Sequence, residues 1–265
     1  IGKLNTDQTV FAFSGILDGD GHTLSYSKGS KPLFNFVSDA RIENLCIYGQ
    51  EIDGNGLIDS SFMDRNRTAV TLDKITLKSG TSTLKSGLIG GTYTYTNPVF
   101  IRNCKAEEGV IIGYDRSQHG IGTFVGDLIG RVENCSSYAT VYGQGAVGGI
   151  VGRKSEAMGM FQVCNCSFFG NVEATGDYVG GVVGSGYKAD SAPNTPAVSI
   201  ENCYATGLVK GSNYVGGIFG GEGGLEQCWE NGIGYIRNNH FCGTLSATAQ
   251  DAIAGGIIGY MNSLN

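Results

Sequence analysis

Acidic, cysteine and histidine side chains are the groups in this sequence that could do chemistry. The 265 residues include 24 Asp and Glu, 8 Cys and 3 His. Asp18 and Asp20 resemble the start of a calcium loop, but the further oxygen ligands and the glutamate at the twelfth position are absent. An Asp-Gly turn accounts for them. A glycosidase needs two carboxylates brought together in space, and the sequence singles out no such pair.

Five cysteines recur at similar positions and are interpreted as a structural column of buried thiols, a role that free Cys fills well. Adjacent strands are about 4.8 Å apart, whereas disulfide Cβ atoms are about 3.8 Å apart, so disulfides within the column would require distortion. Cys164 and Cys166 are too close in sequence for zinc-finger spacing. Cys228 and Cys242 form the one pair for which a disulfide is a hypothesis. The column residues are Cys46, Cys104, Cys135, Cys166 and Cys203.

The three histidines show neither metal-ligand spacing nor a local Ser or Cys partner. They are His22, His119 and His240. His240 stands near the place where other repeats carry cysteine, so we interpret it as the residue that replaces cysteine in its repeat. The sequence therefore predicts no catalytic residue, no metal and no cofactor.

The elements that must position these residues are internal repeats. Gly-Gly, two apolar residues and a further Gly recur at 147–152, 179–184, 215–220 and 254–259. Weaker copies are expected at 125–130, with Asp127 in the second glycine position, and at 86–90, one residue shorter. A second element ends in Asn-Cys or a close variant. Its asparagines, expected to form a ladder at a corner where left-handed backbone is needed, are Asn44, Asn103, Asn134, Asn165 and Asn202.

The spacing of the repeats predicts their architecture. The last glycines of successive copies are separated by 40, 22, 32, 36 and 39 residues, so one unit is constant and one connection varies. The shortest step divides into three runs of strand length. We therefore predict an all-β fold, a right-handed parallel β-helix or β-solenoid with core coils of about 20–22 residues and irregular loop insertions. One domain is expected over 1–265, with diverged N-terminal coils in 1–99.

Composition agrees with this prediction and excludes other classes. The 44 Gly disfavour helices, and 4 Pro without a Gly-X-Y period exclude collagen. With 41% hydrophobic residues the chain can bury a core. A net charge of −6 argues against nucleic acid as a partner, and no apolar run is long enough to cross a membrane.

Residues 202–220, with Asn-Cys, Ala-Thr-Gly and Val-Gly-Gly-Ile-Phe-Gly, resemble the GLUG motif of bacterial cell-surface proteins, which include adhesin-like proteins and some immunoglobulin A peptidases. The repeats over 100–265 are identified as GLUG-like. The resemblance implies an extracellular or cell-surface bacterial setting, and Ile1-Gly2 resembles the tail of a preceding segment of a larger surface protein. The motif brings no catalytic residues with it.

The varying connections are the predicted sites of recognition, since loops on a rigid scaffold often bind ligands. They should leave the solenoid along one edge. Their aromatic and polar residues are the candidate ligand-binding set: Tyr93, Tyr95, Tyr187, Lys188, Asp190, Trp229 and Tyr235. We expect a non-catalytic, adhesin-like module that binds a host or environmental glycan or protein. The alternatives are an accessory segment of a secreted peptidase and a carbohydrate-active β-helix enzyme.

Overall fold

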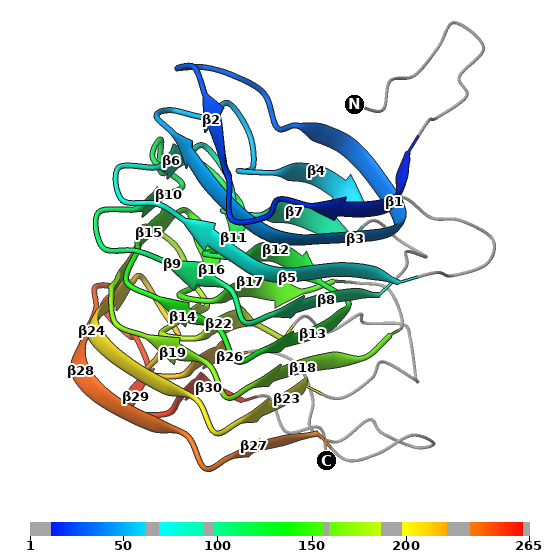
Figure 1. The fold of residues 1–265 in the computed structure, drawn as a ribbon. Coiled ribbons are helices and arrows are strands. Elements are labelled where there is room, and N and C mark those ends of the chain that lie inside the picture. The colour runs from blue at the N-terminus through cyan, green and yellow to red at the C-terminus, as the bar shows by residue number, and fades with distance from the viewer. Residues whose placement is uncertain are drawn as a thin grey trace, which may run out of the picture.

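The computed structural model describes residues 12–61, 69–92, 98–155, 159–186, 198–221 and 234–261. These residues form strands and turns without a helix, and the strands belong to one sheet of 25 and one of 5. Every strand pairing is parallel, and each strand pairs with the equivalent strands of the preceding and following repeats. Figure 1 shows the resulting stack, ordered from the blue N-terminal strands to the orange and red C-terminal ones. The prediction of an all-β fold of parallel strands is confirmed.

The stacked strands form five columns, which we number in chain order within a repeat. Column 1 contains β1 (Phe13–Asp18), part of the long β3 (Phe34–Gly49), β5 (Val70–Leu77), β8 (Val99–Arg102), β13 (Gly130–Glu133), β18 (Phe161–Cys164), β23 (Val198–Glu201) and β27 (Tyr235–Arg237). Column 2 contains β2 (Thr23–Tyr26), the ends of β3 and β5, β9 (Lys105–Ala106), β14 (Ser136–Ser137), β19 (Ser167–Phe168), and the starts of β24 (Tyr204–Gly211) and β28 (His240–Ala247).

The other three columns complete each repeat. Column 3 contains β6 (Ser82–Thr83), β10 (Ile111–Ile112), β15 (Thr140–Gly143), β20 (Asn171–Ala174), and the ends of β24 and β28. Column 4 is the five-stranded sheet: β11 (His119–Gly122), β16 (Gly145–Gly148), β21 (Val179–Gly180), β25 (Val215–Gly216) and β29 (Ala254–Gly255). Column 5 contains the start of β3, β4 (Ile58–Ser61), β7 (Ile89–Thr92), β12 (Val125–Leu128), β17 (Val151–Lys154), β22 (Val183–Ser185), β26 (Phe219–Gly221) and β30 (Ile258–Tyr260).

The core consists of apolar side chains at matching positions of successive repeats. In column 1 one row of completely buried residues consists of Ile42, Leu72, Ile101, Val132, Val163 and Ile200. In column 5 a matching row consists of Ile58, Ile89, Val125, Val151 and Val183. Because neighbouring repeats cover one another, an apolar residue at these positions loses its contact with water only through stacking.

Glycine lets columns 4 and 5 pack against each other with little side chain between them. A Cβ atom added to Gly180 would overlap the carbonyl oxygen of Val183 and lie 2.8 Å from the amide nitrogen of Gly220. Both atoms belong to the backbone, so no side-chain movement could relieve the contact. The Gly-Gly element therefore marks a close backbone approach.

The register of one weak repeat differs from the expectation. Ile121 pairs with Val147, and Val125 pairs with Val151, so the element of this repeat runs over 121–126 and not over 125–130. Thr123 takes the second glycine position, where its buried hydroxyl lies 2.5 Å from the carbonyl oxygen of Gly149. The spacing between matching residues of this repeat and the next is consequently 26 residues, from 125 to 151, rather than 22. Asp127, expected in the glycine position, instead forms an ion pair with Arg153.

Candidate binding surface

The insertions begin and end at equivalent points of the stack, between column 5 and column 1. In the repeat without an insertion, β12 and β13 are separated by Ile129 alone. Elsewhere the paired strands β17 and β22 precede an insertion, and the paired strands β18 and β23 follow it. The longer connections that run through 62–68, 93–97, 156–158, 187–197 and 222–233 all share this position. Their attachment points therefore follow one edge of the stacked strands, as the varying spacing predicted.

Most predicted ligand-binding residues are in the insertions themselves. Six of them lie outside the described residues: Tyr93, Tyr95, Tyr187, Lys188, Asp190 and Trp229. For these the sequence prediction stands untested. The insertion at 62–68 was missed, because Asn55 and Ser86 replace the first glycine of the element in the early repeats and obscure its register.

Tyr235 is the one predicted binding residue that the structure places, and it belongs to a strand rather than to a loop. It begins β27 and is half-buried. Its ring lies 4.2 Å from the Arg237 guanidinium carbon, and its hydroxyl donates a hydrogen bond of 3.4 Å to Glu201. The other carboxylate oxygen of Glu201 accepts a bond of 2.8 Å from Nε of Arg237.

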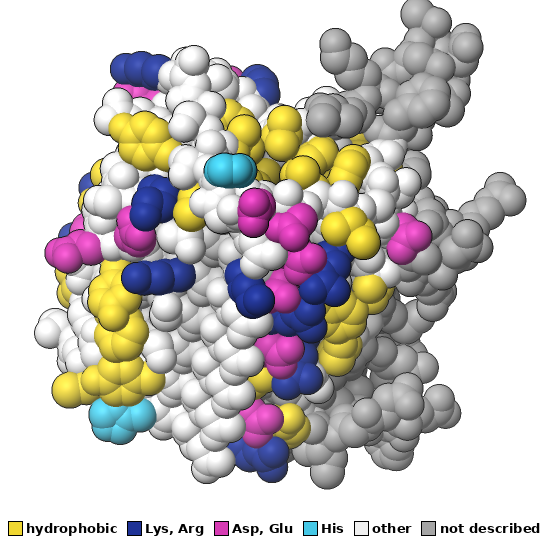
Figure 2. Space-filling model, viewed as in Figure 1, with side chains coloured by type: hydrophobic (Ala, Val, Ile, Leu, Met, Phe, Trp, Pro, Cys, Tyr) yellow, Lys and Arg dark blue, Asp and Glu magenta, His cyan; other side chains and the backbone are white. Residues whose placement is uncertain are grey.

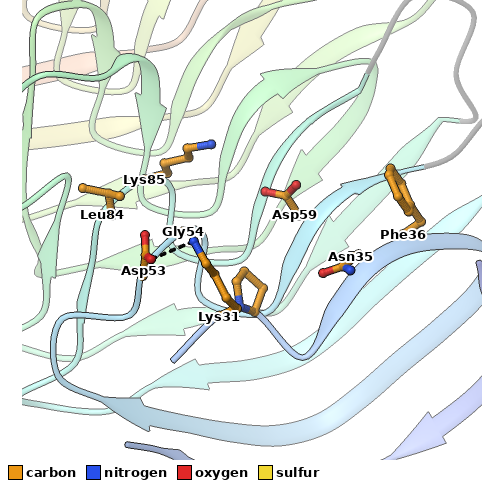
Figure 3. Close-up of a pocket in the computed structure, with 9 residues that line it drawn as sticks. Lys31, Asn35, Phe36, Asp53, Gly54, Asp59, Leu84 and Lys85 are labelled. Atoms are coloured by element: carbon orange, nitrogen blue, oxygen red, sulfur yellow. Dashed lines mark ion pairs between the residues drawn. The ribbon is translucent and has the colours of Figure 1, made fainter. Parts of the chain in front are cut away.

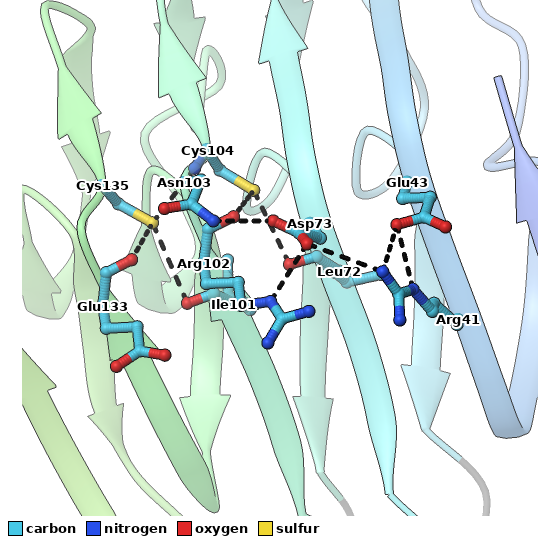
Figure 4. A network of polar contacts seen from close by, with 10 residues as sticks. All are labelled: Arg41, Glu43, Leu72, Asp73, Ile101, Arg102, Asn103, Cys104, Glu133 and Cys135. Atoms are coloured by element: carbon cyan, nitrogen blue, oxygen red, sulfur yellow. Dashed lines mark hydrogen bonds and ion pairs between the residues drawn. The ribbon is translucent and has the colours of Figure 1, made fainter. Parts of the chain in front are cut away.

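This cluster continues a charged stripe on the outer side of column 1. Figure 2 shows acidic and basic side chains gathered there, and Figure 4 shows its upper part. Arg102 lies 3.0 Å from Asp73, which is largely buried. Further pairs join Arg41 to Glu43, Arg131 to Glu133 and Arg237 to Glu201.

Hydrogen bonding to Glu201 raises the pKa of Arg237, and hydrogen bonding to Glu43 raises the pKa of Arg41. Because each charge is matched by an opposite one in the next position or the next repeat, the stripe stabilises the stack and presents little uncompensated charge.

The asparagines occupy the bend between columns 1 and 2. All five have a φ between 52° and 54°, in the left-handed region. A direct bond of 3.2 Å joins the side chains of Asn165 and Asn202. Asn103 instead donates to Asp73 at 2.8 Å, and Asn44 donates to Asp18 at 3.0 Å. The amide ladder is thus partly replaced by carboxylates in the early repeats, where Lys74 takes the bend position between Asn44 and Asn103.

In four successive repeats the residue that follows the bend is a cysteine that points into the core, and these residues form the cysteine column. Cys104, Cys135, Cys166 and Cys203 are buried there as free thiols. Burial raises the pKa of Cys135, which favours the unreactive thiol.

Cys46 does not belong to this column, contrary to the expectation. It pairs with Thr76, while Leu45 and Ile75 fill the inward positions directly after the bend. Leu45 takes the position that Cys104 occupies in its own repeat, so Cys46 stands one residue later, in the outward position of Thr76 and Lys105, and is half-exposed.

The other candidate chemistry is scattered. Cys242 is exposed, and Cys228, its hypothetical disulfide partner, lies outside the described residues. His240 is exposed and stacks on Tyr204 with ring centroids 5.3 Å apart, while Asn239 precedes it in the cysteine position. This contact continues an outward aromatic row through Tyr138 and Phe169 that sequence reasoning missed. Among the described residues no three His, Cys, Asp or Glu side chains come together as a metal site.

Comparison with known proteins adds no relative. No family model matches the chain, and neither a curated protein nor a solved structure matches it. In the part of the chain that the structure describes, no helix has the length and hydrophobicity to span a bilayer.

Proposed function

We propose that this chain is a non-catalytic segment of a bacterial cell-surface protein that binds a glycan or a protein of the host or the environment. In this proposal the parallel strands form a right-handed β-helix, and the insertions carry the binding residues. The resemblance of residues 202–220 to the GLUG motif supports the extracellular setting.

The observation that carries the proposal is the shared attachment edge of the insertions. Each insertion leaves from column 5 and returns to column 1, and these columns are held in register by parallel pairing through the stack. A rigid scaffold that brings variable segments to one edge is a common arrangement for recognition. Tyrosine and tryptophan in these segments suit contact with sugars and proteins, since each combines an apolar ring with a polar group.

A glycan array probed with the whole chain tests the proposal. The double variant Tyr187→Ala and Trp229→Ala is expected to lose array binding while its thermal unfolding stays close to that of the original chain. Tyr138→Ala is the matched control, because Tyr138 is 42% exposed on column 2, away from the insertion edge. Binding that survives the double variant, or that Tyr138→Ala abolishes equally, would contradict the assignment to the edge.

A further inference from the structure

A polar cavity of about 480 Å³ lies against the first repeats. It is formed by strand residues and short connections and not by the insertions. Figure 3 shows its charged side chains arriving from separate segments of the chain. The residues that line it are Lys31, Pro32, Asn35, Phe36, Asp53, Gly54, Asp59, Leu84 and Lys85.

The cavity exists because the early repeats depart from the glycine pattern. Phe34 pairs with Ile58, and Ile58 pairs with Ile89, so Asn35 and Asp59 occupy the position of Gly90. The later repeats carry glycine at this position: Gly126, Gly152, Gly184, Gly220 and Gly259. Polar side chains therefore project where later repeats have none.

The connection between columns 3 and 5 is also shorter in these repeats. The first glycine positions, Asn55 and Ser86, come three positions after the bridged residues Ile52 and Thr83. In a later repeat Gly148 comes seven positions after Val141, and strand β16 lies in this longer connection. Column 4 accordingly begins only at β11. The shortened connections contribute Asp53, Gly54, Leu84 and Lys85 to the cavity.

A buried amide holds one wall of the cavity in place. The Asn55 side chain, in a residue only 1% exposed, donates to the carbonyl oxygen of Asp59 at 3.2 Å and to its carboxylate at 3.4 Å. Its own oxygen accepts a bond of 3.0 Å from the amide of Ser86. The position of Asp59 is therefore set by the core of the stack before any ligand arrives.

The charges around the cavity balance in sign. Lys31 pairs with Asp53 at 2.7 Å, and this pair is largely exposed. Lys85 has no ion-pair partner among the described residues, and Asp59 supplies the second carboxylate. Two lysines and two aspartates leave no net charge to retain an ion, but they provide strong donors and acceptors of hydrogen bonds.

From this lining we infer that the cavity binds a neutral sugar, such as the terminal residue of a glycan. Sugar hydroxyls both donate and accept hydrogen bonds, so they match Asp59 and Lys85 together. The volume falls within the range of about 300–1,000 Å³ typical of small-molecule sites. This site goes beyond the proposed function, which places binding on the insertions.

Saturation-transfer NMR on the whole chain tests this site. The probes are the methyl glycosides of glucose, galactose, mannose and N-acetylglucosamine. At least one should bind, and both Asp59→Asn and Lys85→Met should raise its Kd roughly tenfold, because each removes a charged hydrogen-bonding group. Lys28→Met is the control, since Lys28 pairs with Glu51 and does not line the cavity.

The inference is overturned if no glycoside binds, or if binding is unchanged in both cavity variants. Should Asp59→Asn disturb folding, Lys85→Met decides alone. The variant Tyr187→Ala and Trp229→Ala should retain glycoside binding in the cavity. Failure of the insertion edge as a binding site and failure of the cavity therefore give different results.

Discussion

A methyl group added to the second glycine of the Gly-Gly element should destabilise an inner repeat and leave the last one unharmed. In Gly181→Ala the new Cβ would overlap the carbonyl oxygen of Gly217 in the next repeat and lie 3.0 Å from Cβ of Ala205. In Gly256→Ala, at the matching position of the last repeat, no atom lies within 4 Å of it. The two variants change the same residue type at the same position of the Gly-Gly element.

The magnitude follows from the contacts. Relief of the overlap at Gly181 requires the stacked backbones to separate, although the Gly181 amide donates a bond of 3.1 Å to the Gly216 carbonyl. Overpacking of this kind costs about 1–3 kcal/mol. Alanine also restricts the unfolded chain, which stabilises the folded state by about 0.4–1 kcal/mol. We expect Gly181→Ala to lose roughly 1–2 kcal/mol, whereas Gly256→Ala should be neutral or slightly stabilising.

Equilibrium unfolding in urea, followed by circular dichroism, measures both changes. In thermal unfolding the loss corresponds to roughly 2–4 °C per kcal/mol for a chain of this size. Equal destabilisation by the two variants would refute the argument, because the local sequence and not the stacking would then require glycine. A stable Gly181→Ala variant would refute it as well.

Two further predictions concern buried groups. The four buried thiols should resist Ellman's reagent until the chain unfolds, and rapid labelling of Cys104, Cys135, Cys166 and Cys203 in the native chain would contradict their burial. The variant Cys166→Ser should lower the free energy of unfolding by roughly 1–3 kcal/mol, because it buries a hydroxyl in an apolar column. Burial lowers the pKa of Lys154 from 10.5 to about 8. Between these pH values the unfolded chain binds more protons than the folded chain, so the free energy of unfolding should rise with pH, by at most about 3 kcal/mol. Lys154→Met should lose this rise, and urea unfolding at pH 7.5 and pH 10 tests it; an identical pH profile in the variant would exclude Lys154 as the cause.

The repeats were predictable because they depend on local sequence. Asparagine tolerates the left-handed backbone better than most residues, so its recurrence indicated a bend once per repeat. Recurrence of the Gly-Gly element indicated the repeats themselves. The register of the early repeats was not predictable, since Asn55, Ser86 and Thr123 stand in glycine positions that only strand pairing identifies. The error over Cys46 has the same cause, because only strand pairing shows that Leu45, and not Cys46, takes the position that cysteine occupies in later repeats.

The cavity was missed for a related reason. Asn35, Asp59 and Lys85 are unremarkable in the sequence, and they are separated from one another by more than 20 residues. A sequence signal was available in hindsight, since polar residues replace glycine in the early repeats and their connections are shorter. This signal indicates a cavity only once the repeats are aligned, and the alignment comes from the strand register.

The sequence by itself determined the all-β class, the parallel stacking and the edge from which the insertions leave. These follow from properties that each repeat carries alone: strand length, glycine and asparagine at bends, and the spacing between them. The tertiary structure decided which residues share a column, where the five-stranded sheet begins and where a cavity opens. Those features depend on register between residues 23 to 39 positions apart, and a shift of one residue exchanges the buried and exposed faces of a strand.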